Sequence, residues 1–274
     1  MGEPPFLLKS LLGHLELDRE FYDLEDPHFL RQLWHKVKIR GKILSKITKT
    51  IKLAALWLPD KGRERIIVDK SLPEPKIKWA SFHDTTHSIL EWHRPYFLGD
   101  TAQTLDPDFQ GELEEDANYG ASGLMFGGEI FTRDALDTNP EWNSVVALKK
   151  VYKTSYVTTL RRYVQFSHNI PMALIVSTPS WKTIPEGQDH RCRHFIKSKT
   201  FEIQFSSITR NLLLEIIDDN TTMRRGGPVG NFSLDLLNIN GDIHEFYAES
   251  FFNQHDILTL IYYSKQMNSK RNFI

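Results

Sequence analysis

The chain has 274 residues, of which 40% are apolar and 12% aromatic, so it can bury the core of one large domain or two smaller ones. Its 34 basic residues nearly balance 35 acidic ones, which argues against a uniformly basic nucleic-acid binder. Cys192 is the single cysteine, which excludes an internal disulfide and a cysteine-based zinc site. With no signal-peptide pattern and no apolar run near the ~20 residues of a membrane span, we expect a soluble cytoplasmic protein.

Residues 6–60 show a mainly helical pattern. Apolar side chains recur there at helical spacing in two groups, Phe29-Leu30-Leu33-Trp34 and Ile43-Leu44-Ile47-Ile51. The segment Arg31–Lys52 contains eight basic residues and no acidic one. This basic run is either a solvated helix face or a surface that contacts DNA or an acidic protein. We favour the solvated face, so direct nucleic-acid binding stays open but less favoured.

The next part of the chain changes from a strand pattern to a helical one. The expected elements are a strand Arg65–Asp69, a helix from about Lys76 to Trp92 and a helix from Glu112 to about Met125. Arg94-Pro95 stops the first of these helices, and Gly127-Gly128 ends the second.

A pair of helices is expected next, over Glu141–Tyr152 and Ser155–Phe166, with a short turn between them. Such a pair could be a helix-turn-helix that reads DNA. We favour a plain structural hairpin, because its apolar side chains are needed for packing; they are Leu148, Val151, Leu160 and Val164.

After Pro171 the pattern becomes typical of strands. The candidate strands are Met172–Ser177, Phe201–Phe205, Leu212–Ile217, Phe232–Leu237 and Ile257–Tyr263. This change predicts a domain boundary near residue 170. We therefore expect an α+β protein with an N-terminal domain over residues 1–140, a helical pair over 141–170 and a β-rich C-terminal domain over 171–274.

Two histidines one helical turn apart indicate a metal site. His83 and His87 lie on the same face of the expected helix, so both imidazoles can reach one ion. Asp84 lies beside them, where metallopeptidases carry a carboxylate that takes a proton from the zinc-bound water. Because two histidines at this spacing are common, the second helix has to supply further support.

That helix offers a third ligand. Glu114 and Asn118 share one helix face, so Glu114 can complete a three-ligand site while Asn118 hydrogen-bonds a ligand histidine and fixes its tautomer. His93 is a competing third ligand, since its distance in sequence from His83 is that of metzincins. We favour Glu114, because Leu90 stands where metzincins have the Gly that turns the chain back. His93 is then expected near the rim of the cleft.

These residues predict zinc-hydrolase chemistry. Zn²⁺ lowers the pKa of its water toward ~7, and Asp84 accepts the proton and passes it to the leaving amine. The neighbouring acids Glu115 and Asp116 are expected to be solvated. Tyr119 and His93 are weak candidates for an oxyanion contact, and Tyr119 fits a packing role equally well. The strand at Arg65–Val68 can offer an edge for an extended substrate.

The sequence resembles the ImmA/IrrE family of zinc metallopeptidases, the bacterial and phage regulators that cleave a repressor. Residues 76–94 resemble its first motif helix, through His83-Asp84-Thr85-Thr86-His87 and Trp92-His93-Arg94. Residues 114–125 resemble its second, through the acids at its start, Ala117-Asn118-Tyr119 and Leu124-Met125. Residues 148–164, with Arg161-Arg162-Tyr163, resemble the helical pair that follows. The likeness covers about residues 65–166.

The resemblance implies a zincin-like peptidase core in which His83, His87 and Glu114 bind Zn²⁺ and Asp84 is the general base. It also implies a protein substrate, a DNA-binding repressor, and a β-rich C-terminal extension that is sensor-like in some members. The sequence departs from the family in two places: Phe126-Gly127 replaces a Pro, and Asp84 replaces a Glu. A carboxylate one methylene shorter falls roughly 1.5 Å short, and a misplacement of about 1 Å can cost a hundredfold in rate.

Two functions follow from this departure. The leading hypothesis is a zinc endopeptidase that cleaves a transcriptional repressor in a regulatory response. The alternative is a catalytically weak zinc-binding module that holds a protein partner without cleaving it. Asp84 separates the two.

Overall fold

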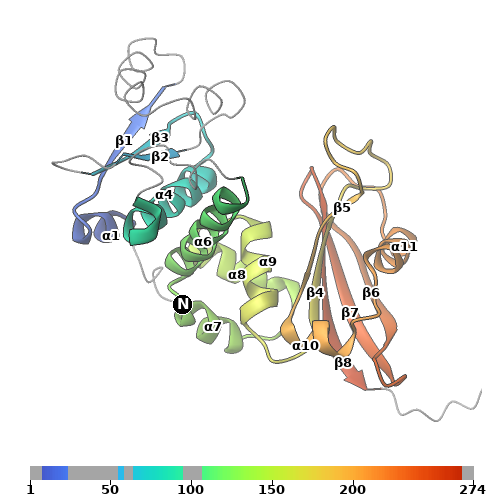
Figure 1. The fold of residues 1–274 in the computed structure, drawn as a ribbon. Coiled ribbons are helices and arrows are strands. Elements are labelled where there is room, and N and C mark those ends of the chain that lie inside the picture. The colour runs from blue at the N-terminus through green and yellow to red at the C-terminus, as the bar shows by residue number, and fades with distance from the viewer. Residues whose placement is uncertain (1–7, 24–54, 59–63, 95–106, 267–274) are drawn as a thin grey trace, which may run out of the picture. The chain divides into compact units, whose positions relative to one another are not determined.

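The computed structural model describes residues 8–23, 55–58, 64–94 and 107–266. The helical groups and basic run expected between Phe29 and Lys52 lie outside these ranges. The chain forms two compact units, within residues 2–130 and 131–274, and each contains its own sheet and helices (Figure 1). The expected α+β class is therefore confirmed. None of the helices in the described ranges has the length and apolar character needed to cross a bilayer.

The N-terminal unit contains a three-stranded sheet of order β1-β3-β2. β3 (Arg65–Asp69) is parallel to β1 (Asp18–Tyr22), which follows helix α1 (Leu8–His14), and antiparallel to β2 (Ala55–Leu58). The strand predicted at β3 is confirmed, but its prediction as an edge is wrong, because β3 is bonded on both sides. Among the described strands of this sheet, β1 and β2 lie at the edges. Both strands also lie within residues 6–60, where the sequence predicted mainly helix, so that prediction is wrong for these two segments.

Helix α4 (Glu74–Ile89) packs against this sheet and confirms the first predicted helix. Pro73 precedes it, where the fixed φ of proline suits entry into a helix. Ile77 on α4 packs on a core formed with Trp57, Ile66 and Val68 of the strands. The predicted end of this helix at Arg94-Pro95 is wrong, because Leu90 is already extended and a separate 3₁₀ turn, η2 (Glu91–His93), follows it.

Helix α6 (Pro107–Phe126) packs along α4 and confirms the second predicted helix. It ends as predicted at Gly127 and Gly128, whose φ values of 64° and 58° are accessible to glycine without strain. The short helix α7 (Glu129–Leu136), which the sequence reading missed, begins directly after them.

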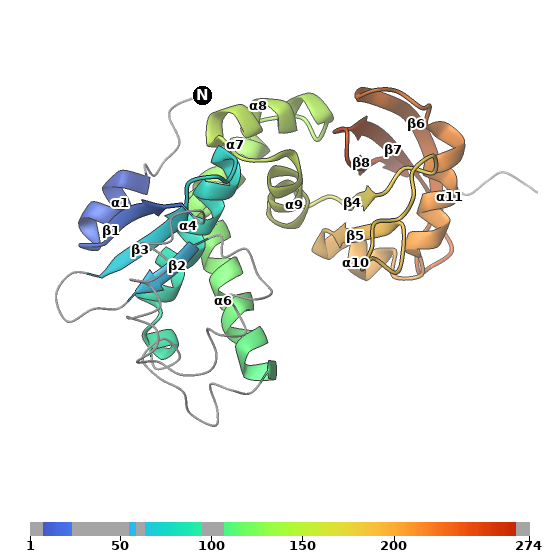
Figure 2. The ribbon, with the colours of Figure 1, turned by 90° about the horizontal axis from the view of Figure 1, so that it is seen from above.

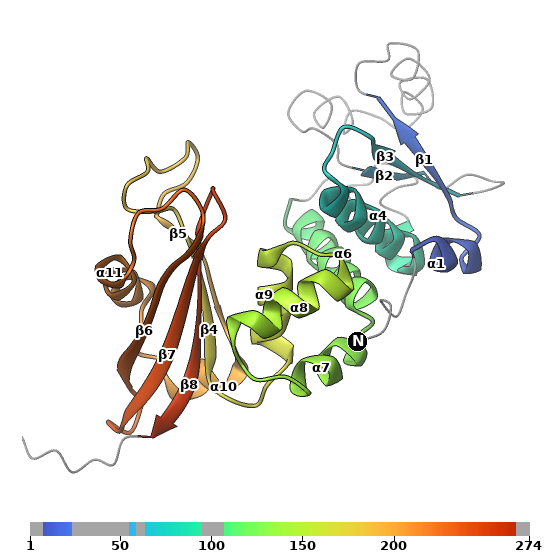
Figure 3. The ribbon, with the colours of Figure 1, turned by 180° about the vertical axis from the view of Figure 1, so that it is seen from behind.

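The C-terminal unit contains a five-stranded sheet of order β5-β4-β8-β7-β6, in which all neighbours are antiparallel (Figure 3). The strands are β4 (Met172–Ser177), β5 (Cys192–Lys197), β6 (Gly227–Leu237), β7 (Ile243–Phe252) and β8 (Ile257–Gln266). The predictions for β4, β6 and β8 are confirmed, whereas β5 and β7 were missed.

Two sets of helices cover this sheet. Phe246 and Ala248 of β7 are buried in a core with side chains of α10 (Lys199–Gln204) and α11 (Arg210–Asn220), and α11 lies against the sheet in Figure 2. Phe251 belongs to the opposite side-chain register of the same strand. It stacks on Trp142, at the start of α8 (Trp142–Tyr152), with 5.1 Å between ring centroids.

Two predicted strands are wrong. Phe201–Phe205 lies largely in helix α10, and Leu212–Ile217 lies in helix α11. Each helix begins at a hydroxyl cap that alternation of apolar residues does not reveal: Ser198 accepts a hydrogen bond from the Phe201 N–H, and Thr209 accepts one from the Leu212 N–H.

The division between the units falls at Ile130/Phe131, earlier in the chain than the boundary near residue 170 that the change of pattern predicts. The helical pair α8 and α9 (Tyr156–Phe166) explains the difference, because it belongs to the C-terminal unit. Besides the stacking on Phe251, the Trp142 N–H donates to the Glu249 carboxylate of β7 at 2.6 Å.

Candidate metal centre

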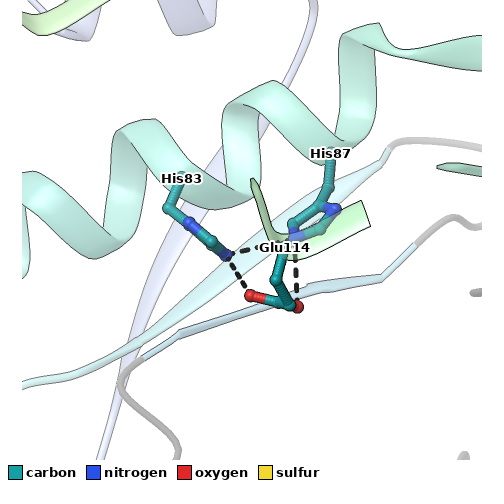
Figure 4. A group of neighbouring side chains, drawn as sticks. All are labelled: His83, His87 and Glu114. Carbon is teal, nitrogen blue, oxygen red and sulfur yellow. Dashed lines mark hydrogen bonds and ion pairs between the residues drawn. The ribbon is translucent and has the colours of Figure 1, made fainter. Parts of the chain in front are cut away.

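Helix α4 presents two histidines on one face. His83 and His87 are four residues apart, and their rings meet edge to face with centroids 4.8 Å apart. Their Nε2 atoms are 3.1 Å apart (Figure 4). His87 is buried at 2% exposure, whereas His83 is only partly buried.

Small residues on α6 allow this helix to approach the histidines closely. Ala117 and Ala121 are fully buried, and Gly120 lies against Thr86, which is between the two histidines in sequence. A Cβ atom at position 120 would come within 2.4 Å of the Thr86 Cγ2. The contact between α4 and α6 therefore depends on the glycine.

This approach brings Glu114 of α6 to both histidines. Its Oε2 lies 3.1 Å from the His83 Nε2, and its Oε1 lies 3.6 Å from the His87 Nε2 (Figure 4). The Glu114 side chain remains 54% exposed, so solvent reaches the group.

The spacing of the three side chains fits a shared metal ion. Their nearest ligand atoms all lie within 4.8 Å of one another, which makes them a group that can hold a metal. Ligands bound tetrahedrally at ~2.0–2.1 Å from zinc lie roughly 3.3–3.4 Å apart. The two Nε2 atoms are 3.1 Å apart, and the two Glu114 oxygens lie 3.1 Å from the His83 Nε2 and 3.6 Å from the His87 Nε2, so each of these pairs is close to that value.

The charge states of His87 and Glu114 suit metal binding. Burial and the neighbouring His83 lower the pKa of His87 to about 3, so His87 is neutral and keeps a lone pair for a metal. The hydrogen bond to His83 lowers the pKa of Glu114, which keeps that carboxylate ionised. Burial lowers the pKa of His83, but the hydrogen bond to Glu114 and the charges of Asp84 and Glu114 outweigh it, and the net shift is upward.

Asp84, the predicted general base, is attached to the sheet. It is buried at 5% exposure, and its Oδ1 accepts a hydrogen bond from the Trp57 N–H of β2 at 2.9 Å. Burial raises the pKa of Asp84 to about 7, against the opposing effects of the His83 charge and this hydrogen bond. At least one oxygen of the carboxylate therefore has a structural role.

His93, the competing third ligand, lies on the other side of His87. Its Nδ1 is 2.8 Å from the Nδ1 of His87, whereas the Nε2 of His87 faces His83 and Glu114. His93 is fully buried, which differs from the expected position at a cleft rim. The three-membered group thus contains Glu114 and not His93.

Asp116 is the residue near the site that the sequence reading missed. It is exposed, as expected, with 52% of its side chain open to solvent, but its Oδ2 also accepts from the Trp92 indole N–H at 3.1 Å and lies 3.6 Å from the Nε2 of His93. In the sequence, the one indication that Asp116 lies near the site is its position two residues after Glu114. The turn that brings η2 back toward α6 could not be read from spacing.

The two remaining predicted residues lie on the exposed side of α6. Asn118 makes a small contribution that raises the pKa of His83, but the buried Nδ1 of His83 has no hydrogen-bond partner within the described part of the chain. The tautomer-fixing role of Asn118 therefore stays a prediction. Tyr119 is 72% exposed, which does not fit a packing role, and no contact links it to the histidines in the described ranges.

Comparisons with known proteins bear on the fold. No protein-family model and no curated protein matches this sequence. A solved structure described as a Mycobacterium tuberculosis transcriptional regulator is similar, with a TM-score of 0.50 over 94% of this chain and 69% of the other. The two sequences are 9% identical, so the similarity concerns the arrangement of the chain alone.

Proposed function

We propose that the chain is a zinc-dependent endopeptidase with a zincin-like core, in which His83, His87 and Glu114 hold Zn²⁺. One observation carries the proposal: two histidines of one helix and a carboxylate of another gather with one ligand atom each within 4.8 Å of the others. Three protein ligands leave a fourth position for water, as hydrolysis requires, and Glu114 is exposed enough for a substrate to approach.

In this proposal zinc supplies a Lewis acid and lowers the pKa of a water at the open position. The protein's own groups do the rest. His87 stays neutral and oriented, Glu114 stays ionised, and Asp84 accepts the proton of the attacking water and passes it to the leaving amine.

The proposed substrate is a protein, specifically a DNA-binding repressor, cleaved in the cytoplasm in a regulatory response. The resemblance of residues 65–166 to repressor-cleaving peptidases supports this substrate class. The description of the structural neighbour as a transcriptional regulator is in keeping with a role in gene regulation.

A second candidate function is a zinc-binding module that holds a protein partner without cleaving it. The hydrogen bond between Asp84 and the Trp57 N–H favours this alternative, because a carboxylate held by the sheet is less free to take a proton.

Substitutions at Asp84 separate the two functions. Asp84→Asn keeps an oxygen that can accept from Trp57 but removes the base, so it should retain the fold and zinc and lose about 10²–10⁴ in cleavage rate. The assay incubates the zinc-loaded protein with repressor-type proteins from its own genome and follows cleavage with and without a chelator.

Cleavage by Asp84→Asn at the wild-type rate would remove Asp84 from the mechanism. Zinc-dependent binding of a repressor by wild type, without cleavage of any candidate, would favour the module.

A further inference from the structure

A second group of polar side chains lies behind the candidate metal centre, on the side away from Glu114. It consists of His93 and Asp116, with Trp92 donating its indole N–H to the carboxylate. We propose that His93 and Asp116 hold the ring of His87 in the tautomer and orientation that direct its Nε2 lone pair toward the metal. This inference rests on the proposed metal site and assigns the pair a positioning role.

The donors and acceptors must alternate through the two rings. A neutral imidazole carries one proton, so a His87 that offers its Nε2 lone pair to a metal has its proton on Nδ1. The partner of that proton is the Nδ1 of His93, 2.8 Å away, which must then accept. His93 in turn carries its proton on Nε2. This buried atom has no hydrogen-bond partner in the described part of the chain, and the Asp116 Oδ2 lies 3.6 Å from it, at the distance of an ion pair.

The negative charge of Asp116 thus favours a proton on the Nε2 of His93, and the hydrogen bond between the two rings then places the proton of His87 on its Nδ1. A carboxylate is an acceptor only, so it favours the Nε2–H form of the ring beside it. Metal-binding histidines commonly donate their second N–H to a carboxylate, and that contact raises the basicity of the ligand. Here a second histidine stands between the carboxylate and the ligand.

Burial protects the His93 part of this arrangement. His93 has 0% exposure, so no bulk water competes for its nitrogens. The Asp116 side chain is 52% exposed, but the Trp92 N–H orients it at 3.1 Å. Because Asp116 is on the same helix as Glu114, two residues further on, α6 supplies both a metal ligand and the carboxylate that orients another ligand.

The geometry does not fit metal binding by His93. Its nearest contact on His87 is the Nδ1 atom, whereas the histidine and carboxylate atoms that can share an ion gather around the Nε2 atom. A role in packing alone would leave metal affinity and ring tautomers unchanged when Asp116 is replaced by its isosteric amide.

The test measures affinity for Zn²⁺ alone, by competition with a chelator, on the full-length chain. Asp116→Asn should weaken zinc binding about 10–100-fold. Glu115→Gln, which removes the neighbouring exposed acid, should bind as wild type does. His93→Gln, whose amide oxygen can still accept from His87, should bind more tightly than His93→Leu.

Nitrogen NMR of histidine-labelled protein reports the tautomers directly. In the zinc-loaded wild type we expect protons on the His87 Nδ1 and the His93 Nε2, and a mixed tautomer of His93 in Asp116→Asn. Wild-type zinc affinity in both Asp116→Asn and His93→Leu, or a proton on the His93 Nδ1, would overturn the inference while leaving the metal site intact. A wild-type chain that binds no zinc would overturn both.

Discussion

The close contact between α4 and α6 makes Gly120 the most informative position for a substitution outside the ligands. In Gly120→Ala the added Cβ lies 2.4 Å from the Thr86 Cγ2. Carbon atoms in contact are normally about 3.5–4.0 Å apart, so the helices must separate by about 1 Å or Thr86 must turn. Turning is unfavourable, because the Thr86 hydroxyl donates to the Phe82 carbonyl at 2.9 Å.

Two opposing effects set the magnitude. Overpacking a buried contact costs about 1–3 kcal/mol, while Ala in place of Gly in a helix contributes about 1 kcal/mol. The free energy of unfolding of Gly120→Ala should therefore fall by up to about 2 kcal/mol. If the helices relax apart without metal and must close again to bring Glu114 to His83, a strain of about 1–2 kcal/mol lowers zinc affinity roughly 5–30-fold.

Gly123→Ala is the matched control. It lies on the same helix, and its added Cβ meets nothing within 4 Å. It should be as stable as wild type or up to about 1 kcal/mol more stable, with unchanged zinc affinity. Denaturant unfolding without metal and chelator competition for zinc measure both quantities. Adding Thr86→Ser, which removes the crowding methyl and keeps the hydroxyl, should restore the affinity of Gly120→Ala.

Equal stability and equal zinc affinity of the Gly120→Ala and Gly123→Ala chains would refute this reasoning. Such a result would mean that α6 does not need this close approach to deliver Glu114. A stability loss that Thr86→Ser does not relieve would place the strain at another contact.

Three further predictions follow from the site and the division of the chain. Wild type should hold one zinc per chain by elemental analysis, removable by a chelator, and Glu114→Ala should hold none; full zinc in this variant would exclude Glu114 as a ligand. A fragment ending at residue 130 should be folded, as measured by circular dichroism, and should bind zinc. A fragment ending at residue 170 lacks Phe251, so Trp142 should become exposed and the fragment should bind hydrophobic dyes. Burial raises the pKa of Glu249 in the folded protein above its usual 4.5, so the stability that its protonated form contributes is present at acidic pH and lost as the pH rises through this pKa. The free energy of unfolding of Glu249→Gln, measured by denaturation at several pH values, should lack this pH dependence. A pH profile equal to that of wild type would contradict the prediction.

The sequence was most informative where one periodicity dominated. The helical spacing of His83 and His87 and the run from Glu114 to Met125 predicted helices that the structure contains, together with the face that each presents. The Gly pair at 127–128 located the end of α6. These features are local, so a short window of sequence contains the information needed to predict them.

Features that depend on contacts between distant segments were not predicted. Apolar alternation in Phe201–Phe205 suggested a strand, but the cap at Ser198 and the buried pair of phenylalanines one turn apart belong to a helix. The meeting of His93 with Asp116 requires a 3₁₀ turn to place one segment beside another. The parallel pairing of β1 with β3, which made β3 a central strand, is likewise a long-range contact.

The Trp57 N–H, which donates to Asp84, is a donor for which a substrate carbonyl could compete with the Asp84 carboxylate. β2 is an edge among the described strands of its sheet, and a peptide adding to such an edge pairs through main-chain groups. If a substrate carbonyl took the Trp57 N–H, the Asp84 carboxylate would be released at the moment the substrate arrived. If Asp84 is the general base of the proposed peptidase, its proton acceptance would then be coupled to substrate binding, and without substrate its carboxylate would stay bonded to the Trp57 N–H.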